Sequence, residues 1–174
     1  MALLIPEAPT LRAPLKIRPH LRRAVAADRD DLIRFVEELS PSSSQHRFLT
    51  GLGGRVPRAL VEQLLSGGRG GGALVALVAD RIVAHGLWAR SAGPDQPVAE
   101  LALVVADAYQ RQGIGSMLTD AMLVEMKCDG IERVQVVTGA GNRPVLGMLT
   151  KRRPGVKPTE RDGAVVTYDL AVRP

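Results

Sequence analysis

Aromatic residues and cysteine are scarce in this sequence of 174 residues. Phe, Trp and Tyr together make up 3% of the chain, so the core has to be built from Ala, Val, Leu and Ile. The single cysteine, Cys128, excludes an intrachain disulfide, and the three histidines are scattered without metal-ligand spacing. We therefore expect no bound metal, and a protein that works in a reducing cytoplasm.

Long apolar runs are also missing. Residues 1–5 are apolar, but no basic segment precedes them and Pro6 follows, which does not fit a signal sequence. No later run is long enough to cross a bilayer. The expectation is a soluble protein that does not associate with membranes.

The excess of positive charge favours an anionic partner. Lys and Arg number 23 against 18 Asp and Glu, which gives a net charge of +5 and a pI of about 10.0. Nucleic acid, a membrane surface and a phosphorylated cofactor would all suit this charge. The basic residues are dispersed and aromatic side chains for base stacking are nearly absent, so nucleic acid is disfavoured as a partner.

The length predicts one domain. Residues 1–19 contain four prolines and little periodicity, which predicts a partly ordered arm, and residues 20–174 form the single domain. The pattern predicts strands over 20–25, 73–79, 82–89, 98–106, 131–137 and 163–172, and helices over 28–39, 56–66, 113–127 and 142–152, with a short helix within 40–49. This order predicts a mixed α/β (α+β) fold with helices on both faces of the sheet. We interpret the glycine-rich segment at 67–72 as a flexible linker.

The segment QRQGIG, residues 110–115, lies between a predicted strand and a predicted helix. Glycines at 113 and 115 would let an anion approach the backbone N–H groups at the helix start, and Arg111 would add a charged contact. A tight turn in which glycine serves only packing explains the same spacing, so the residues alone leave both interpretations open.

The same segment resembles the Q/R-x-x-G-x-G/A signature of the GNAT N-acyltransferase superfamily. AELALVVADAYQRQGIG and LSPSSSQHRFL are similar to the bacterial protein-lysine acetyltransferase branch of that superfamily. The resemblance implies a GNAT-like fold, a central, mostly antiparallel mixed sheet with one splayed parallel strand pair. It also implies that the turn binds the diphosphate of acetyl-CoA.

The resemblance implies a cofactor site along the strand and the turn. The pantetheine arm would lie against residues 103–105 and 134–137, with one N–H near Val104 polarising the thioester carbonyl. Asn142 matches an asparagine that contacts the arm, although a helix N-cap explains it equally well. The implied cofactor-binding residues are Leu103, Val104, Val105, Gln110, Arg111, Gln112, Gly113, Ile114, Gly115, Ser116 and Asn142.

Glu100 is the candidate general base, because an ammonium has to lose a proton before it can attack. It matches the position of the catalytic glutamate in the lysine-acetylating branch, and the alternative is a solvated charge at the strand end. The family's usual tyrosine acid is missing from the last helix. We interpret Tyr109 and Tyr168 as packing or surface residues.

Several other residues have a functional and a structural interpretation. Residues 37–38 and 46–47 fall where the family lines its acceptor groove, but a polar helix face is favoured. The basic residues 151–153 either meet the 3'-phosphate or end a helix in solvent. Cys128 is interpreted as an inert thiol and Trp88 as a core residue.

The leading hypothesis is an acetyl-CoA-dependent N-acetyltransferase. A primary amine, for which a protein lysine is one candidate, would attack the thioester directly in a ternary complex. An aminoglycoside or small-amine acetyltransferase, a non-catalytic acyl-CoA-binding module and a small nucleic-acid-binding domain are the alternatives. The resemblance also implies a homodimer.

Overall fold

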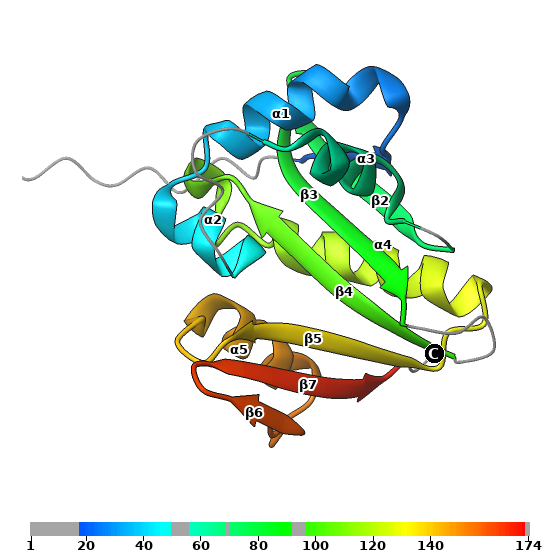
Figure 1. Ribbon diagram of the computed structural model, residues 1–174, viewed down its shortest axis with the longest axis vertical. Helices are drawn as coiled ribbons and strands as arrows, with labels where there is room; N and C mark the ends of the chain where they lie inside the picture. The colour runs from blue at the N-terminus through cyan, green and yellow to red at the C-terminus, as the bar shows by residue number, and fades with distance from the viewer. Residues whose placement is uncertain (1–17, 50–55, 69, 92–96, 173–174) are drawn as a thin grey trace, which may run out of the picture.

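The computed structural model describes residues 18–49, 56–68, 70–91 and 97–172. They form a seven-stranded mixed sheet with helices on both faces, which confirms the predicted fold class (Figure 1). The strand order is β1-β2-β3-β4-β5-β7-β6. The predicted N-terminal arm, residues 1–19, lies outside the described residues except for Arg18 and Pro19.

Each predicted strand and helix is present, with boundaries that shift by a few residues. The strands are β1 (His20–Arg23), β2 (Gly72–Val78), β3 (Arg81–Arg90), β4 (Val98–Val105), β5 (Arg133–Gly139), β6 (Glu160–Asp162) and β7 (Val165–Ala171). The helices are α1 (Arg29–Glu37), α2 (Pro41–Phe48), α3 (Arg58–Ser66), α4 (Ile114–Cys128) and α5 (Arg143–Arg152). The short edge strand β6 was not predicted. No helix in the described ranges is both long and apolar enough to cross a bilayer.

Antiparallel pairing joins β1 through β4 into a meander. The β2–β3 hairpin turns at Ala79 and Asp80, whose φ angles of 47° and 61° are both left-handed, as in a type I′ turn. The turn therefore lies one residue earlier than residues 80 and 81, which separate the predicted strands over 73–79 and 82–89. The register brings His85 of β3 opposite Val104 of β4.

The parallel pair β4–β5 is joined only at its start. The register runs from Val98↔Arg133 to Glu100↔Gln135 and then stops, although both strands continue for several residues. Beyond this point the two strands diverge, with α2 beside the opening (Figure 1). The splayed pair that the resemblance implied is therefore present.

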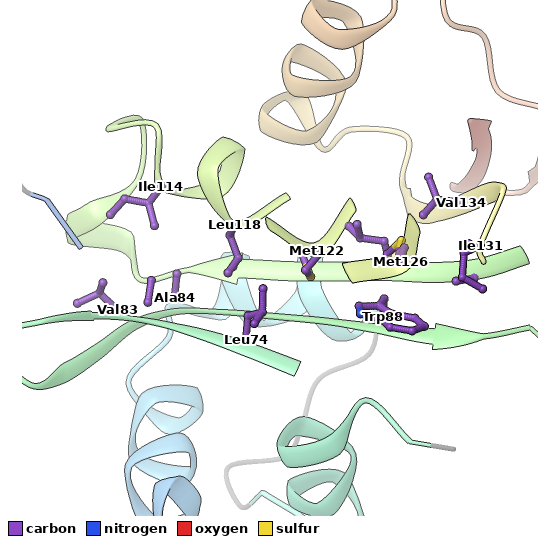
Figure 2. Close-up of a cluster of buried hydrophobic side chains, with 13 residues drawn as sticks. Leu74, Val83, Ala84, Trp88, Ile114, Leu118, Met122, Met126, Ile131 and Val134 are labelled. Carbon is purple, nitrogen blue, oxygen red and sulfur yellow. The ribbon is translucent and has the colours of Figure 1, made fainter. Parts of the chain in front are cut away.

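One face of the sheet carries the larger apolar core. Leu118, Met122 and Met126 of α4 are fully buried, and they pack with Trp88 of β3 and Ile131 (Figure 2). Large aliphatic and thioether side chains fill this space, as the scarcity of aromatic residues requires. The prediction that Trp88 is a core residue is confirmed.

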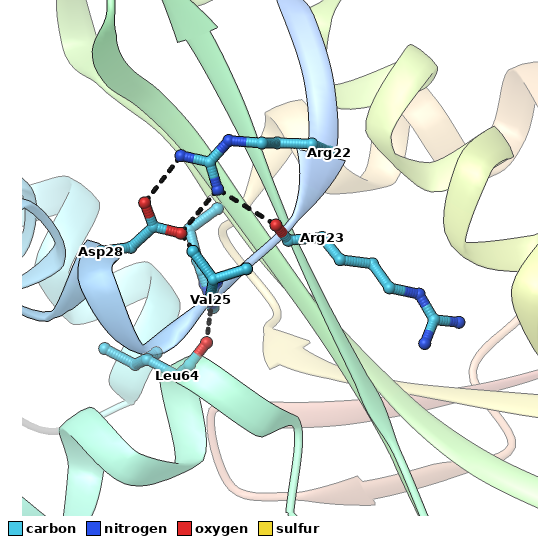
Figure 3. A network of polar contacts seen from close by, with 6 residues as sticks. Arg22, Arg23, Val25, Asp28 and Leu64 are labelled. Carbon is cyan, nitrogen blue, oxygen red and sulfur yellow. Dashed lines mark hydrogen bonds and ion pairs between the residues drawn. The ribbon is translucent and has the colours of Figure 1, made fainter.

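The opposite face is covered by α1 and α3, where Leu32, Val61 and Val75 are buried. A bidentate ion pair fixes the start of this layer: Arg22 donates to both carboxylate oxygens of Asp28 at 2.6 and 2.7 Å (Figure 3). The hydrogen bonds from Arg22 hold the pKa of Asp28 below its usual value.

The glycine run after α3 is a packed turn. Gly67 has φ 70°, and a Cβ there would lie 2.6 Å from the carbonyl oxygen of Trp88. A Cβ on Gly71 would come within 2.2 Å of the same oxygen. The linker interpretation was therefore wrong at Gly67 and Gly71, because the backbone there lies directly against β3 and leaves no room for a side chain, whereas a Cβ on Gly68 would meet nothing within 4 Å.

Candidate active site

A cavity of about 570 Å³ opens where β4 and β5 diverge. It reaches from α2 on one side to the start of α4 and to α5 on the other. Its lining from β4, β5 and the turn consists of Leu101, Ala102, Leu103, Val104, Val105, Asp107, Tyr109, Gln110, Arg111, Gly113, Gly115, Ser116, Val136, Val137 and Thr138. Its lining from α2 and α5 consists of Ser42, Ser43, His46, Arg47, Asn142, Arg143, Pro144, Val145, Gly147, Met148 and Lys151.

The backbone of β4 presents alternate residues to this cavity. Ala106 N donates to Val83 O at 2.8 Å, and Ser91 N donates to Val98 O at 3.0 Å, which fixes the even-numbered residues of β4 as those bonded to β3. The N–H groups of Leu103 and Val105 therefore point towards β5, beyond the last β4–β5 pair. The N–H of Val104 points the other way, towards His85.

The same alternation holds on β5. Ala140 N donates to Ala164 O and Val172 N donates to Glu132 O, both at 2.8 Å, so the even-numbered residues of β5 bond to β7. The backbone groups of Val137 then face β4 across the opening. Two facing strands thus carry peptide groups that have no strand partner in the described part of the chain.

The turn between β4 and α4 has the backbone of an anion site. Gly113 precedes α4 with φ 86°, which favours glycine, and Arg111 takes a left-handed φ of 63°. A Cβ on Gly113 would meet nothing within 4 Å, and Gly113, Gly115 and Ser116 line the cavity at the start of this helix. These N–H groups and the helix dipole favour a bound anion.

A polar cluster ties α2 to this turn. Asp107 accepts hydrogen bonds from Ser40 N at 3.1 Å, Ser40 Oγ at 2.7 Å and Ser43 Oγ at 2.8 Å. Burial acts to raise the pKa of Asp107, but the hydrogen bonds from Ser40 and Ser43 outweigh it and leave this pKa below its usual value. Sequence reasoning missed this cluster, because the serines and Asp107 are more than 60 residues apart.

The side chain of Gln110 belongs to the same cluster. Its Nε2 donates to Ser43 Oγ and to Val105 O, each at 3.0 Å. The signature glutamine thus holds the end of β4 and helix α2 together, and it satisfies a carbonyl that faces the opening. Gln112 is exposed and donates instead to Ala108 O at 3.1 Å.

Three ionisable side chains lie on the α2 side of β4. Glu100 is exposed between buried neighbours at the last β4–β5 pair, and it is not among the cavity-lining residues. Arg47 of α2 lines the cavity, and burial lowers its pKa to about 10 although the charge of Glu100 opposes this shift. Burial and then the charge of Arg47 lower the pKa of His85 to about 3.

His85 is therefore neutral in the folded protein. Its Nε2 lies 2.8 Å from Leu64 O, so this nitrogen carries the hydrogen. Its Nδ1 and the Nε of Arg47 are the buried side-chain polar atoms without a hydrogen-bond partner among the described residues. Neither unpaired atom could be predicted from the sequence, although residues 46–47 were placed near the acceptor groove, because an unpaired polar atom is visible only after the register and packing are known.

Some polar residues of α5 beside the cavity stabilise the helix itself. Asn142 is buried as the N-cap of α5, where its Oδ1 accepts from Val145 N at 3.3 Å and its Nδ2 donates to Thr138 Oγ1 at 2.9 Å. The N-cap interpretation is confirmed, and the residue also lines the cavity. Arg152 pairs with Asp120 of α4 at 2.6 Å, which leaves Lys151 as the cavity-lining residue of the basic segment.

The cavity thus brings together most of the residues named from the sequence and excludes a few. Of the twelve, those at the cavity are Leu103, Val104, Val105, Gln110, Arg111, Gly113, Gly115, Ser116 and Asn142, and those not lining it are Glu100, Gln112 and Ile114.

Residues expected at the acceptor groove divide between the cavity and the surface. His46 and Arg47 line the cavity, whereas Glu38 pairs with Arg81 at 2.9 Å and neither Glu37 nor Glu38 lines it. Within the described ranges, no group of three or more His, Cys, Asp or Glu side chains is arranged to hold a metal ion.

Comparison with known proteins adds a family and a fold. Residues 41–153 match the acetyltransferase (GNAT) family. The GNAT domain of PAT from S. lividans superposes with a TM-score of 0.78 at 20% identity, over 88% of this chain and 90% of that one. A GNAT-family acetyltransferase from Streptococcus pneumoniae gives 0.70 at 16% identity, over 88% and 99%. An N-acetyltransferase from Staphylococcus aureus Mu50 gives 0.69 at 15% identity, over 90% and 99%.

Proposed function

Because the chain belongs to the GNAT acetyltransferase family, we propose that it transfers an acetyl group from acetyl-CoA to a primary amine. The observation that carries this proposal is the opening between β4 and β5, where unpaired peptide groups stand beside a helix N-terminus. A linear ligand with amide groups and a diphosphate fits that arrangement.

The residues at the cavity suit each part of such a cofactor. The N–H groups of Leu103 and Val105 and the backbone of Val137 offer the strand-like hydrogen bonds that pantetheine amides need. The turn at Gly113 suits the diphosphate, and Arg111 and Lys151 at the cavity suit its remaining charge. Bound acetyl-CoA supplies the acetyl group as a reactive thioester.

The chain's own residues would then prepare the amine. We assign Glu100 as the base that removes a proton from the incoming ammonium, directly or through a water molecule. Two features of Glu100 support this role. Its side chain is exposed at the last β4–β5 pair, after which the two strands diverge, and it lies on the face of the sheet that α2 covers. Alternation along β4 assigns Leu103 or Val105, rather than Val104, as the N–H that would bind the thioester carbonyl.

The described part of α5 contains no tyrosine to act as an acid. Tyr168 is buried in the small core between β5, β7 and α5, which confirms its interpretation as a packing residue. Tyr109 packs against the α4 core and also lines the cavity.

Two further parts of the proposal concern partners. The acceptor is a protein lysine or a small amine, the first supported by the likeness of two sequence segments to the lysine-acetylating branch. Self-association would use an edge strand of the sheet, and β1 and β6 are those edges. Sedimentation of the full chain tests the second part, since a monomer at all concentrations would contradict it.

The direct test measures CoA release from acetyl-CoA over a panel of amines, lysine peptides and aminoglycosides. We expect Glu100→Gln to lower turnover by about 10²- to 10⁴-fold, because it cannot accept a proton, while acetyl-CoA affinity by calorimetry stays the same. Glu160→Gln on the exposed strand β6 is the matched control and should keep full turnover.

Each outcome separates the alternatives. Full turnover in Glu100→Gln would remove Glu100 from the role of base. Tight acetyl-CoA binding without turnover on any acceptor would favour a non-catalytic acyl-CoA-binding module. Absence of acetyl-CoA binding would overturn the cofactor site itself.

A further inference from the structure

The guanidinium of Arg47 is the unexplained charge of the cavity. It extends from α2, lines the cavity and lies 5.0 Å from the ring centroid of Phe48. Its Nε is fully buried and has no hydrogen-bond partner among the described residues. A buried donor left without a partner destabilises a protein, so its retention at a cavity needs a reason.

Seven other arginines in the described ranges form ion pairs with carboxylates, whereas several exposed ones do not. Ion pairs within 4.0 Å are formed by Arg22, Arg23, Arg29, Arg34, Arg81, Arg133 and Arg152. Arg47 forms no such pair with a described residue, although it is half-buried, whereas Arg23, Arg34, Arg81 and Arg133 are exposed. The negative charge that acts on it is that of Glu100, at a distance that gives an electrostatic effect but no ion pair.

The surroundings of Arg47 do not supply another anion. His85 lies close enough for the charge of Arg47 to lower its pKa, so its ring is neutral, and its Nδ1 also has no hydrogen-bond partner among the described residues. Asp107 is occupied by Ser40 and Ser43. The cavity therefore holds a fixed cation on its α2 side, with the carboxylate of Glu100 near it.

We propose that Arg47 binds a carboxylate of the acceptor, so that the amine activated by Glu100 belongs to a small amino-acid-like molecule. This inference rests on the proposed acetyltransferase function. One zwitterionic molecule would match both charges of the site, with its ammonium group at Glu100 and its carboxylate at Arg47. The planar guanidinium fork suits a carboxylate.

The other acceptor classes fit this arrangement less well. A lysine side chain in a protein carries its amine on a long stem with no carboxylate of its own. An aminoglycoside carries several ammonium groups, which Arg47 would repel. The unpaired cation thus acts as a specificity-determining residue that selects for acceptors with a negative group.

The test compares acids with their amides, which differ in the negative charge. Glycine, β-alanine, 4-aminobutyrate and 6-aminohexanoate, each beside its primary amide, are titrated into the full chain by calorimetry with and without CoA. We expect at least one acid to bind about tenfold to a hundredfold more tightly than its amide. In Arg47→Met this preference should disappear, while amide affinity stays unchanged.

Two further variants keep the result interpretable. Arg47→Lys retains the charge but loses the fork, so it should recover part of the preference. Arg58→Gln, at the exposed start of α3, is the matched control and should keep it in full. Thermal unfolding checks that each variant is folded, and removal of a buried unpaired cation is not expected to destabilise the chain.

The outcomes test the inference about Arg47 separately from the proposed function. If no acid binds more tightly than its amide in wild type, or if Arg47→Met keeps the preference, the inference is wrong. The proposed function survives that result if acetyl-CoA still binds and amines without a carboxylate are acetylated. If acetyl-CoA does not bind, the proposed function fails instead, whatever the acids do.

Discussion

The two faces of the sheet around β4 are built differently. On the α4 face, Leu118, Met122 and Met126 are fully buried in an apolar cluster. On the α2 face, Arg47 and His85 each have a buried polar atom with no hydrogen-bond partner in the described part of the chain, beside an exposed Glu100. Both faces belong to one strand, so the difference comes from the residues that alternate along it and from the helices above them.

This difference suggests that one face of the sheet stabilises the fold and that the other binds ligands and carries the reaction. A complete apolar core can position β4 rigidly, and the opposite face can then tolerate unsatisfied groups that a ligand would satisfy. We therefore expect changes on the α4 face to alter the free energy of unfolding, and changes on the α2 face to alter binding and rate.

The largest stability effect should come from the α4 face. Leu118→Ala removes a fully buried side chain from the centre of the cluster, and we expect a loss of about 3 kcal/mol in the free energy of unfolding. Urea unfolding measures the loss. Affinity for acetyl-CoA, measured where the variant is folded, should stay within about twofold of wild type; a large loss of affinity would show that the faces are not separable.

A pH-dependent effect should come from His85 on the other face. Its pKa is about 3 when folded against about 6.5 when unfolded, so the unfolded chain binds more protons between these values and stability is lost as the pH falls through this range. From pH 6.5 to 5 the expected loss is about 2 kcal/mol. His85→Gln, which can still donate to Leu64 O, should flatten this dependence in urea unfolding, whereas His20→Gln at an exposed position should not.

A smaller effect should come from the cluster that joins α2 to the turn. Asp107→Asn replaces an acceptor oxygen by a donor and leaves one bond from Ser40 or Ser43 unmade. We expect a loss of about 1–2 kcal/mol in urea unfolding, together with weaker acceptor binding because α2 is less firmly held. Asp129→Asn at the exposed end of α4 is the control, and equal behaviour of the two variants would contradict a specific role for Asp107.

The smallest effect on stability is expected at Gly115, where one substitution should stabilise the fold and weaken cofactor binding. Gly115 lies within α4, and a Cβ there would make ordinary contacts of 3.6 and 3.7 Å with Leu103 and Val105. Gly115→Ala should therefore stabilise the helix by up to about 1 kcal/mol. The added methyl group should weaken acetyl-CoA binding in calorimetry, and unchanged affinity would argue that the turn serves only packing.

Much of the fold was predictable because its signals are local. Apolar runs and turn residues marked the strands, and the strand–glycine turn–helix order of residues 98–127 marked the cofactor side of the cavity. The three-residue strand β6 was missed because it is short and fully exposed, with no apolar alternation. The tight packing of Gly67 and Gly71 was also invisible, since it depends on a carbonyl of β3 that lies far along the chain.

The acceptor side was much harder to predict. Arg47, His85 and Asp107 lie in three separate elements, and their relation depends on strand register and on how α2 is seated. The direction of each β4 peptide group is likewise a property of the pairing with β3. Composition and spacing identify a site built on one continuous segment, but not one assembled from distant residues.

Hydrogen exchange of the β4 amides, with and without CoA, tests the central claim most directly. Residue-resolved NMR compares Leu103 and Val105, whose N–H groups face the opening, with Val104, whose N–H faces β3. We predict that CoA slows exchange at Leu103 and Val105 and leaves Val104 unchanged. Unchanged exchange at all three, or equal slowing at all three, would contradict a cofactor bound as a strand between β4 and β5.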